Sequence, residues 1–283
     1  MNLKLNAESD LLSQLKELLH NLNALGQDQV NFDISEAKWI TPLSILPISY
    51  LASINQSSKL IHPDDYSISN YLSTISFPAG TKGLSATHAK SYLPIMTIRS
   101  NSMAEQIYEA IDQYERGILS YLVREQTFRD YIANSIRYFL GEFFTNYQEH
   151  SKASEFRIFS QLYPKRDALE ICLLDNGIGI MNSFLRATTP IQVTDDMDAL
   201  QRAVSGLSTK PGERGYGLRT SIKLICESEL KGEIIILSGS ACYYQKFGQQ
   251  PQIYKLNTSW QGVIVAMTIH KPLSQIDIYK YVE

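Results

Sequence analysis

Three polar side chains recur at every fourth residue in the segment GEFFTNYQEHS, residues 141–151. They are Glu142, Asn146 and His150, and Glu149 lies beside them in the sequence. Residues four apart share one face of an α-helix, so a carboxylate, a carboxamide and an imidazole would line up there. Such a face can form part of a functional site. For an isolated segment, a solvated polar face is the more common alternative.

A second segment, LEICLLDNGIGIM, places Asp175 at the end of an apolar strand and follows it with Gly177 and Gly179. Glycines at alternate positions accept positive φ angles and let the backbone approach a ligand closely. A simple Asp-Asn-Gly turn is the alternative. A dinucleotide-binding fingerprint is disfavoured, because the third glycine is missing and the acidic residue precedes the loop instead of following it.

A third segment, GLSTKPGERGYGLRTS at 206–221, contains Gly215, Tyr216, Gly217 and Leu218 at the start of a helical pattern. Backbone N–H groups at such a helix start form an anion site that suits phosphates. A Walker-type phosphate loop is excluded, because the pattern G-x-x-x-x-G-K-S/T is absent. By itself, the segment could equally be a flexible surface loop.

Hydrophobic periodicity predicts the elements that position these segments. Helical patterns occupy most of 103–150. Two strand-like runs follow at 156–163 and 168–174, joined in the manner of a hairpin by Pro164, Lys165, Arg166 and Asp167. The further strand-like runs are 233–238, 241–244 and 263–270.

The amino-terminal part of the chain reads as a smaller α/β module. A 3.6-residue periodicity predicts a helix over 8–25, and Thr41-Pro42 marks the start of a second helix. The segment 77–91 is rich in small and polar residues, which is typical of a linker. We therefore place a domain boundary there and predict two domains, residues 1–90 and 91–283.

Composition limits the classes of function. The chain of 283 residues has 26 Lys and Arg against 29 Asp and Glu, a formal charge of -3, so nucleic acid is not indicated as a partner. Its three cysteines have no C-x-x-C spacing, which argues against a disulfide framework and a cysteine zinc site. No apolar run approaches the roughly 18 residues that span a bilayer. We expect a cytoplasmic protein that does not bind membranes.

Taken together and in this order, the three segments resemble the conserved boxes of the GHKL, or Bergerat-fold, ATPases. The patterns E-x-x-x-N, D-x-G-x-G and G-x-G-L occur within residues 120–270. The resemblance implies an α/β sandwich in which ATP is held between helices and a mixed sheet. With the amino-terminal module, it predicts an α/β protein in which a smaller module precedes a Bergerat-type domain.

The resemblance also implies roles for individual residues. Asp175 matches the carboxylate that accepts a hydrogen bond from the adenine amine. Asn146 matches the Mg²⁺ ligand, and Glu142 matches the residue that activates the attacking water or hydroxyl. The glycines expected to admit the nucleotide and to contact its phosphates are Gly177, Gly179, Gly215 and Gly217. The other box residues assigned to the ATP site are His150, Tyr216 and Leu218.

Between the two glycine boxes lies a stretch long enough to form a mobile lid. Its hydroxyl and cationic side chains could contact a γ-phosphate. They could also belong to a solvated polar loop. The lid residues assigned to the ATP site are Ser208, Thr209 and Lys210.

The sequence departs from the family pattern in two places. Many members have Gly-Thr at the start of the last strand, whereas Val263 follows Gly262 here. None of the histidines has the setting of a phosphoacceptor in a dimerisation helix, so a typical sensor histidine kinase is not expected. The amino-terminal segment VNFDISEAKWITPLSILPISYLA is similar to the strand, loop and helix of STAS domains. An unrelated docking module is the alternative.

These features predict a Mg²⁺-dependent, ATP-binding GHKL-type ATPase that acts as a nucleotide-driven conformational switch in a regulatory assembly. A protein partner or a homodimer is expected. One alternative is a Ser/Thr protein kinase of the anti-sigma type, in which Glu142 faces a hydroxyl. The other is an ATP-binding scaffold without turnover. The presence of Glu142 argues against the scaffold, because binding alone does not require a carboxylate beside the phosphates.

Overall fold

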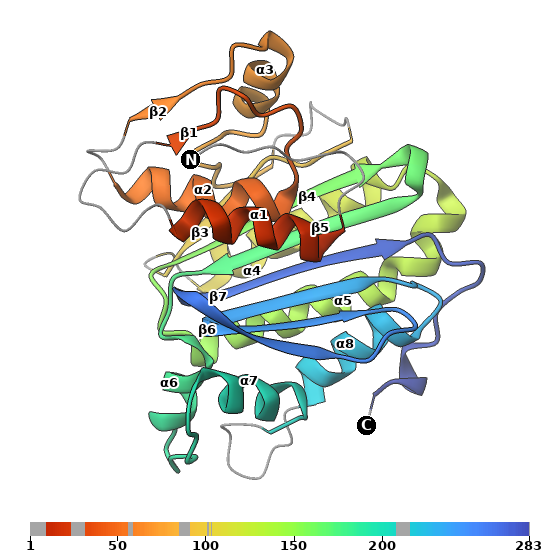
Figure 1. The fold of residues 1–283 in the computed structure, drawn as a ribbon. Helices are drawn as coiled ribbons and strands as arrows, with labels where there is room; N and C mark the ends of the chain where they lie inside the picture. Colours follow the sequence, from red (N-terminus) through yellow and green to blue (C-terminus); the bar gives the residue numbers. More distant parts are fainter. Residues whose placement is uncertain are drawn as a thin grey trace.

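The computed structural model describes residues 10–23, 32–55, 59–84, 91–100, 102, 104–207 and 216–282 (Figure 1). The helices are α1 (Leu11–Asn23), α2 (Pro42–Ile54), α3 (Tyr66–Thr74), α4 (Ala104–Gly117), α5 (Gln126–His150), α6 (Gly179–Leu185), α7 (Asp196–Val204) and α8 (Tyr216–Glu227). The strands are β1 (Phe32–Asp33), β2 (Leu60–Ile61), β3 (Met96–Arg99), β4 (Glu155–Tyr163), β5 (Ala168–Asp175), β6 (Glu233–Lys246) and β7 (Gln252–His270). Within these ranges, no helix combines the length and apolar character needed to cross a membrane.

One five-stranded sheet, in the order β3-β4-β5-β7-β6, forms the centre of the molecule. All four neighbouring pairs are antiparallel, so the predicted mixed sheet is wrong. For two of these pairs, the reason lies in the connections. Short turns join β4 to β5 and β6 to β7, and a short turn can join only antiparallel strands. Parallel pairing occurs between β1 and β2, in a separate two-stranded sheet, and in the isolated bridge between Thr81 and Met96.

The central strands are buried on both faces. Every residue of β5 is buried, and alternate side chains point into two different cores. Leu169, Ile171 and Leu173 contribute to one core, whereas Cys172 and Leu174 contribute to the other. A sheet with this pattern needs a layer of helices on each face.

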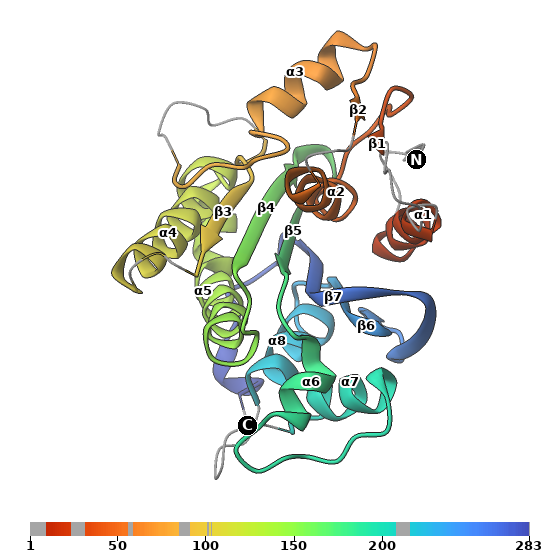
Figure 2. The same cartoon turned by 90° about the vertical axis from the view of Figure 1, so that its left-hand side faces the viewer.

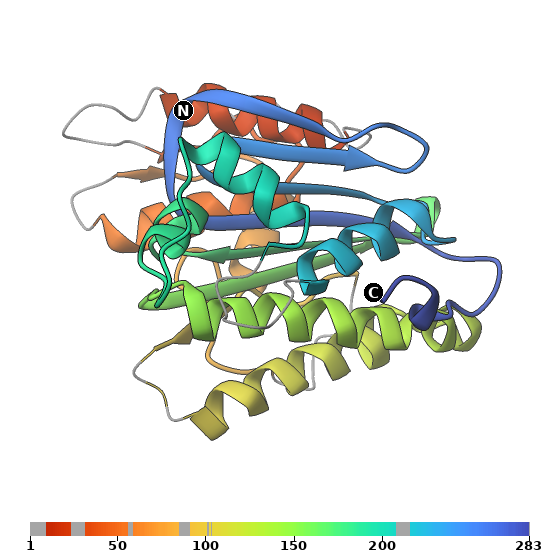
Figure 3. The ribbon, with the colours of Figure 1, turned by 90° about the horizontal axis from the view of Figure 1, so that it is seen from below.

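The carboxyl-terminal helices cover the first face of the sheet. Figures 2 and 3 show α4 and α5 lying alongside each other on this face, with α8 close to α5. The buried residues of these helices include Ile136 and Phe139 of α5 and Ile225 of α8. They share a core with Ile171 of β5 and Met267 of β7. The long helix α5 thereby lies against this face, and its polar residues line the same cleft as the end of β5.

The amino-terminal helices cover the second face (Figure 2). Leu15 and Leu18 of α1 and Leu46 of α2 share a core with Phe159 of β4 and Leu237 of β6. Of the segment 77–91, in which the sequence predicts the boundary, residues 85–90 lie outside the described ranges, whereas Thr81 forms an isolated bridge with Met96 of β3. The parts of the chain before and after residues 85–90 both contribute side chains to this core.

Helix α2 begins where the sequence predicts. Thr41 is its N-cap and Pro42 its first residue, and Thr41 and Ser44 form a reciprocal capping box. Both hydroxyl-bearing residues are buried. They therefore contribute to the structure of the helix start and are not presented at the surface.

Two buried glutamates of the sheet accept hydrogen bonds from the first turns of the amino-terminal helices α1 and α2. Glu170 of β5 accepts hydrogen bonds from the Leu43 backbone N–H (3.4 Å) and from Tyr163 Oη (3.2 Å). Glu233 of β6 accepts one from the Leu11 backbone N–H (3.3 Å). Each carboxyl group thus lies at the first turn of a helix, where backbone N–H groups lack partners within the helix.

The buried Glu170 carboxyl predicts a pH dependence of stability. Burial raises its pKa to about 7, so the folded protein holds this proton more tightly than the unfolded chain does. The resulting stabilisation is complete at low pH and is lost as the pH rises through about 7. When the pH is raised from about 5 to about 8, we expect the ionisation of Glu170 to lower the free energy of unfolding by about 2–3 kcal/mol.

Urea unfolding of the wild type and of Glu170→Gln at both pH values measures this contribution. The carboxamide keeps an acceptor but cannot titrate, so the variant should lack this component of the pH dependence. If the two proteins differ in stability by the same amount at both pH values, Glu170 has no raised pKa in the folded state.

Candidate functional site

A cleft of about 230 Å³ lies between α5, α6, α8 and the first face of the sheet. It brings together parts of all three segments that the sequence singled out. The predicted site residues that line it are Glu142, Asn146, His150, Asp175, Gly179, Tyr216, Gly217 and Leu218. Segments that are separated by more than sixty positions in the sequence thus meet at one place.

Helix α5 contributes one polar edge of the cleft. Glu142, Asn146 and His150 are partly exposed, whereas Phe143 and Tyr147 on the neighbouring face are buried. This division follows from the 3.6-residue period, because the aromatic face packs in the core while the polar face stays partly exposed, and residues of both faces line the cleft. The predicted alignment of the three polar side chains along the cleft is therefore present.

The buried carboxyl group of the cleft belongs to Asp175. It lies at the last position of β5, is 8% exposed, and its Oδ1 accepts a hydrogen bond from the Gly177 backbone N–H (2.8 Å). Burial raises the pKa of Asp175 to about 6, against the opposing effect of the backbone donors at Gly177 and Val263. An ionised acceptor in largely apolar surroundings is suited to a ligand that donates a hydrogen bond.

The loop after Asp175 is built by close backbone contacts. A side chain at Gly177 would lie 2.1 Å from the Ser151 carbonyl oxygen, and that oxygen accepts a hydrogen bond from the Ile178 N–H (2.7 Å). Gly177 is thus required for packing of backbone against backbone, and it is not among the residues that line the cleft. Gly179 does line it and has the positive φ (75°) that the sequence predicts.

The Glu142 carboxylate lies beside the first turn of α8. A Cβ atom at Gly217 would lie 1.7 Å from Glu142 Oε2, so the lack of a side chain at Gly217 lets the carboxylate come this close to the helix start. A negative charge at this position is favourable, because the N-terminus of a helix carries a partial positive charge. The same feature is what makes a helix start an anion site.

Part of the predicted site lies outside the described residues. This applies to the lid residues Ser208, Thr209 and Lys210 and to Gly215, which directly precedes α8.

The apolar wall of the cleft was not predicted from the sequence. Its residues come from elements far apart in the chain, namely Leu173, Ile180, Phe184, Ile236, Val263 and Val265. For the wall residues that lie in strands, only the alternation of side chains could have indicated that they face the same side as Asp175, whereas Ile180 and Phe184 belong to α6. The departure from the family pattern at Val263 therefore lies within the cleft itself.

The donor atoms of the cleft fit a Mg²⁺ ion that takes most of its ligands from phosphates and water. Asn146 offers a carboxamide oxygen and Glu142 a carboxylate one helical turn away. The described residues contain no group of three or more His, Cys, Asp and Glu side chains that could hold a metal. Mg²⁺ is commonly bound through one or two protein oxygens together with phosphates and water, so this donor set is sufficient.

Comparison with known proteins adds no assignment, because no protein-family model matches the chain and no curated protein matches it either.

Proposed function

We propose that the cleft binds ATP together with Mg²⁺ and that the protein is a GHKL-type ATPase with a Bergerat-type domain. The observation that carries the proposal is the meeting of the three resembling segments in one cleft. Polar residues of α5, the buried carboxyl at the end of β5 and the first turn of α8 surround the same space. This arrangement supports a ligand with an amine-bearing aromatic part and an anionic part.

In this proposal, Asp175 accepts a hydrogen bond from the exocyclic amine of adenine. The apolar wall formed by Leu173, Ile180 and Val265 packs against the base. A hydrogen bond to a charged acceptor contributes on the order of 1.5–3 kcal/mol, so this single group has a large effect on affinity.

Asp175→Asn is expected to weaken adenosine binding roughly tenfold or more at neutral pH. The amine of adenosine favours the ionised carboxylate, whose pKa is about 6, so the wild-type affinity should be lost as the pH falls through this value. Between about pH 8 and about pH 5 we expect a decrease of roughly tenfold. Adenosine is the suitable probe because it has no phosphate that titrates in this range.

Calorimetric titrations of both proteins at the two pH values measure this effect. The variant lacks the titrating group, so its weaker affinity should not depend on pH. Equal affinity of wild type and variant for adenosine would remove Asp175 from the base-binding site. Ser183→Ala, at another lining position, is the matched control and should leave adenosine affinity within about twofold of the wild type.

The anionic part of the ligand lies toward α5 and α8. Asn146 provides an oxygen ligand for Mg²⁺, and the first turn of α8, with Gly217, provides N–H groups for phosphate oxygens. When bound, Mg²⁺ neutralises the negative charge that develops on the phosphates. Glu142 lies one turn before Asn146, where its carboxylate can accept a proton from the attacking water.

The fate of the γ-phosphate distinguishes the three activities that this cleft supports. Release of labelled phosphate from γ-labelled ATP identifies an ATPase, and transfer to a protein identifies a Ser/Thr kinase. A bound nucleotide without either product identifies a scaffold. We propose the ATPase, acting as a nucleotide-driven switch that a protein partner or a second subunit senses.

A further inference from the structure

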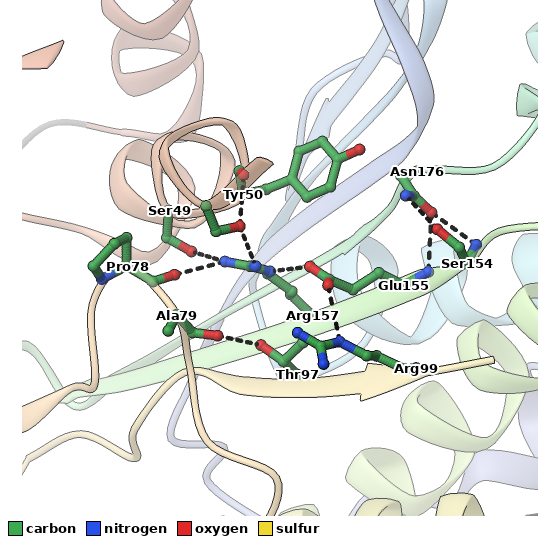
Figure 4. A network of polar contacts seen from close by, with 11 residues as sticks. Ser49, Tyr50, Pro78, Ala79, Thr97, Arg99, Ser154, Glu155, Arg157 and Asn176 are labelled. Carbon is green, nitrogen blue, oxygen red and sulfur yellow. Dashed lines mark hydrogen bonds and ion pairs between the residues drawn. The ribbon is translucent and has the colours of Figure 1, made fainter. Parts of the chain in front are cut away.

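Arg157 of β4 is a charged side chain enclosed between the sheet and the amino-terminal helices (Figure 4). It is 1% exposed, and its guanidinium group lies 5.7 Å from the centre of the Tyr50 ring. Nη1 donates hydrogen bonds to Ser49 Oγ (2.7 Å) and to the Pro78 carbonyl (2.8 Å). Nη2 donates to Ser53 Oγ (2.6 Å). Three acceptors from residues 49–78 thus hold this cation.

The docking of α2 and the position of Arg157 depend on each other. A buried guanidinium is strongly unfavourable unless its N–H groups have acceptors, and α2 supplies two of them through Ser49 and Ser53. The remaining partner is the carboxylate of Glu155, whose Oε1 accepts from Arg157 Nε (2.5 Å). The Oε2 atom of Glu155 also lies 3.7 Å from Arg99 Nε, and this ion pair links β3 to β4 within the same network.

The same network reaches the loop of the candidate site. Asn176 Oδ1 accepts hydrogen bonds from the backbone N–H groups of Ser154 and Glu155, both at 3.0 Å. Asn176 Nδ2 donates to Ser154 Oγ (2.9 Å). Figure 4 shows Asn176 and Arg157 on opposite sides of the Glu155 segment. Asn176 directly follows Asp175, so it holds the loop in the position in which the Gly177 N–H reaches the Asp175 carboxylate.

We propose that Arg157 and Asn176 are positioning residues that couple the docking of α2 on the sheet to the geometry of the Asp175 loop. Through these two residues, the docking of the amino-terminal helices determines the affinity of the cleft for adenosine. This statement about affinity rests on the proposed function. Neither residue lines the cleft, so both act through the backbone of residues 154–155 and through Asp175. Because coupling between two sites is reciprocal, occupancy of the cleft also stabilises the docked α2.

The test removes the acceptors at the α2 end only. The double variant Ser49→Ala, Ser53→Ala keeps Arg157, Asn176 and every residue of the cleft. Hydrogen exchange without ligand should become about fivefold faster or more at the Gly177 and Ile178 amides. Adenosine affinity should fall by a similar factor.

Tyr71→Phe is the matched control. It removes the hydrogen bond from Tyr71 Oη to Gln161 Oε1 (2.7 Å), which also joins the amino-terminal part to β4 but lies toward the other end of that strand. It should leave Gly177 and Ile178 exchange and adenosine affinity at wild-type values.

Asn176→Ala provides an independent arm if the double variant does not fold. It should accelerate exchange at Gly177 and Ile178 and abolish the slowing of α2 exchange that we expect adenosine to cause in the wild type. Asn176→Asp keeps the acceptor for the two backbone N–H groups and should restore most of the protection.

Two outcomes separate this proposal from the proposed function. If exchange in α2 accelerates in the double variant while Gly177 and Ile178 exchange as in the wild type, the coupling is overturned. If adenosine does not bind the wild type, the proposed function fails, but the ligand-free exchange at Gly177 and Ile178 still decides the coupling.

Discussion

Glu142→Ala is expected to bind ATP and to lose turnover by roughly 10²–10⁴-fold, the usual contribution of a positioned general base. The carboxylate lies one helical turn before Asn146 and beside the first turn of α8 at Gly217. Phosphates bound at that helix start would lie close to this negative charge. Removal of the charge relieves repulsion, so nucleotide affinity should stay the same or increase slightly while the chemical step is lost.

Turnover is measured with γ-labelled ATP, alone and with candidate protein partners, and affinity is measured separately by calorimetry. Glu149→Ala is the matched control, because Glu149 is a second carboxylate of α5 at the cleft and is not among the atoms nearest to Gly217. We expect its turnover to remain within about threefold of the wild-type rate. Turnover of Glu142→Ala at the wild-type rate would exclude Glu142 as the base.

Phe159→Ala is expected to lower the free energy of unfolding by about 3–5 kcal/mol, the usual cost of removing a fully buried phenyl ring. Phe159 of β4 is 0% exposed and packs in the core shared by the sheet and the amino-terminal helices. The cost arises because the ring leaves a cavity between two layers that cannot both relax. Because the sheet and the amino-terminal helices share this core, urea unfolding should show one cooperative transition, with its midpoint at a lower urea concentration than in the wild type.

Phe247→Ala is the control for this variant. The same substitution is made at a phenylalanine that is 42% exposed, in the turn between β6 and β7, and should change stability by less than about 0.5 kcal/mol. An equal, small effect at both positions would mean that the amino-terminal helices do not bury this face of the sheet in solution.

Several parts of the fold could be predicted because they depend on neighbours in the sequence. The polar face of α5 follows from a four-residue spacing, and the start of α2 follows from the capping residues Thr41 and Pro42. The hairpin between β4 and β5 follows from the turn at Pro164–Arg166 and Asp167, which takes a left-handed conformation with φ 45°. Local sterics and local hydrogen bonds decide each of these features.

The position of Asp175 at the end of a buried strand could also be predicted, but the order and direction of the neighbouring strands could not. The apolar run ALEICLL indicates a strand without indicating its partners, and a mixed sheet was the wrong expectation. Strand order is decided by pairings between distant segments, such as β5 with β7, and the sequence pattern of either strand is compatible with several neighbours.

By itself, the sequence determined which residues could do chemistry and on which kind of element each lies, because those properties depend on residue type and on spacing within one helix or strand. Tertiary structure alone decided that Glu142, Asp175 and Gly217 meet in one cleft, since their elements are brought together by burial of apolar faces from the whole chain. It also decided that Arg157 is enclosed by α2 and linked to Asn176. A charged residue within a strand gives no local sign of burial, because its acceptors come from a segment about a hundred residues earlier in the chain.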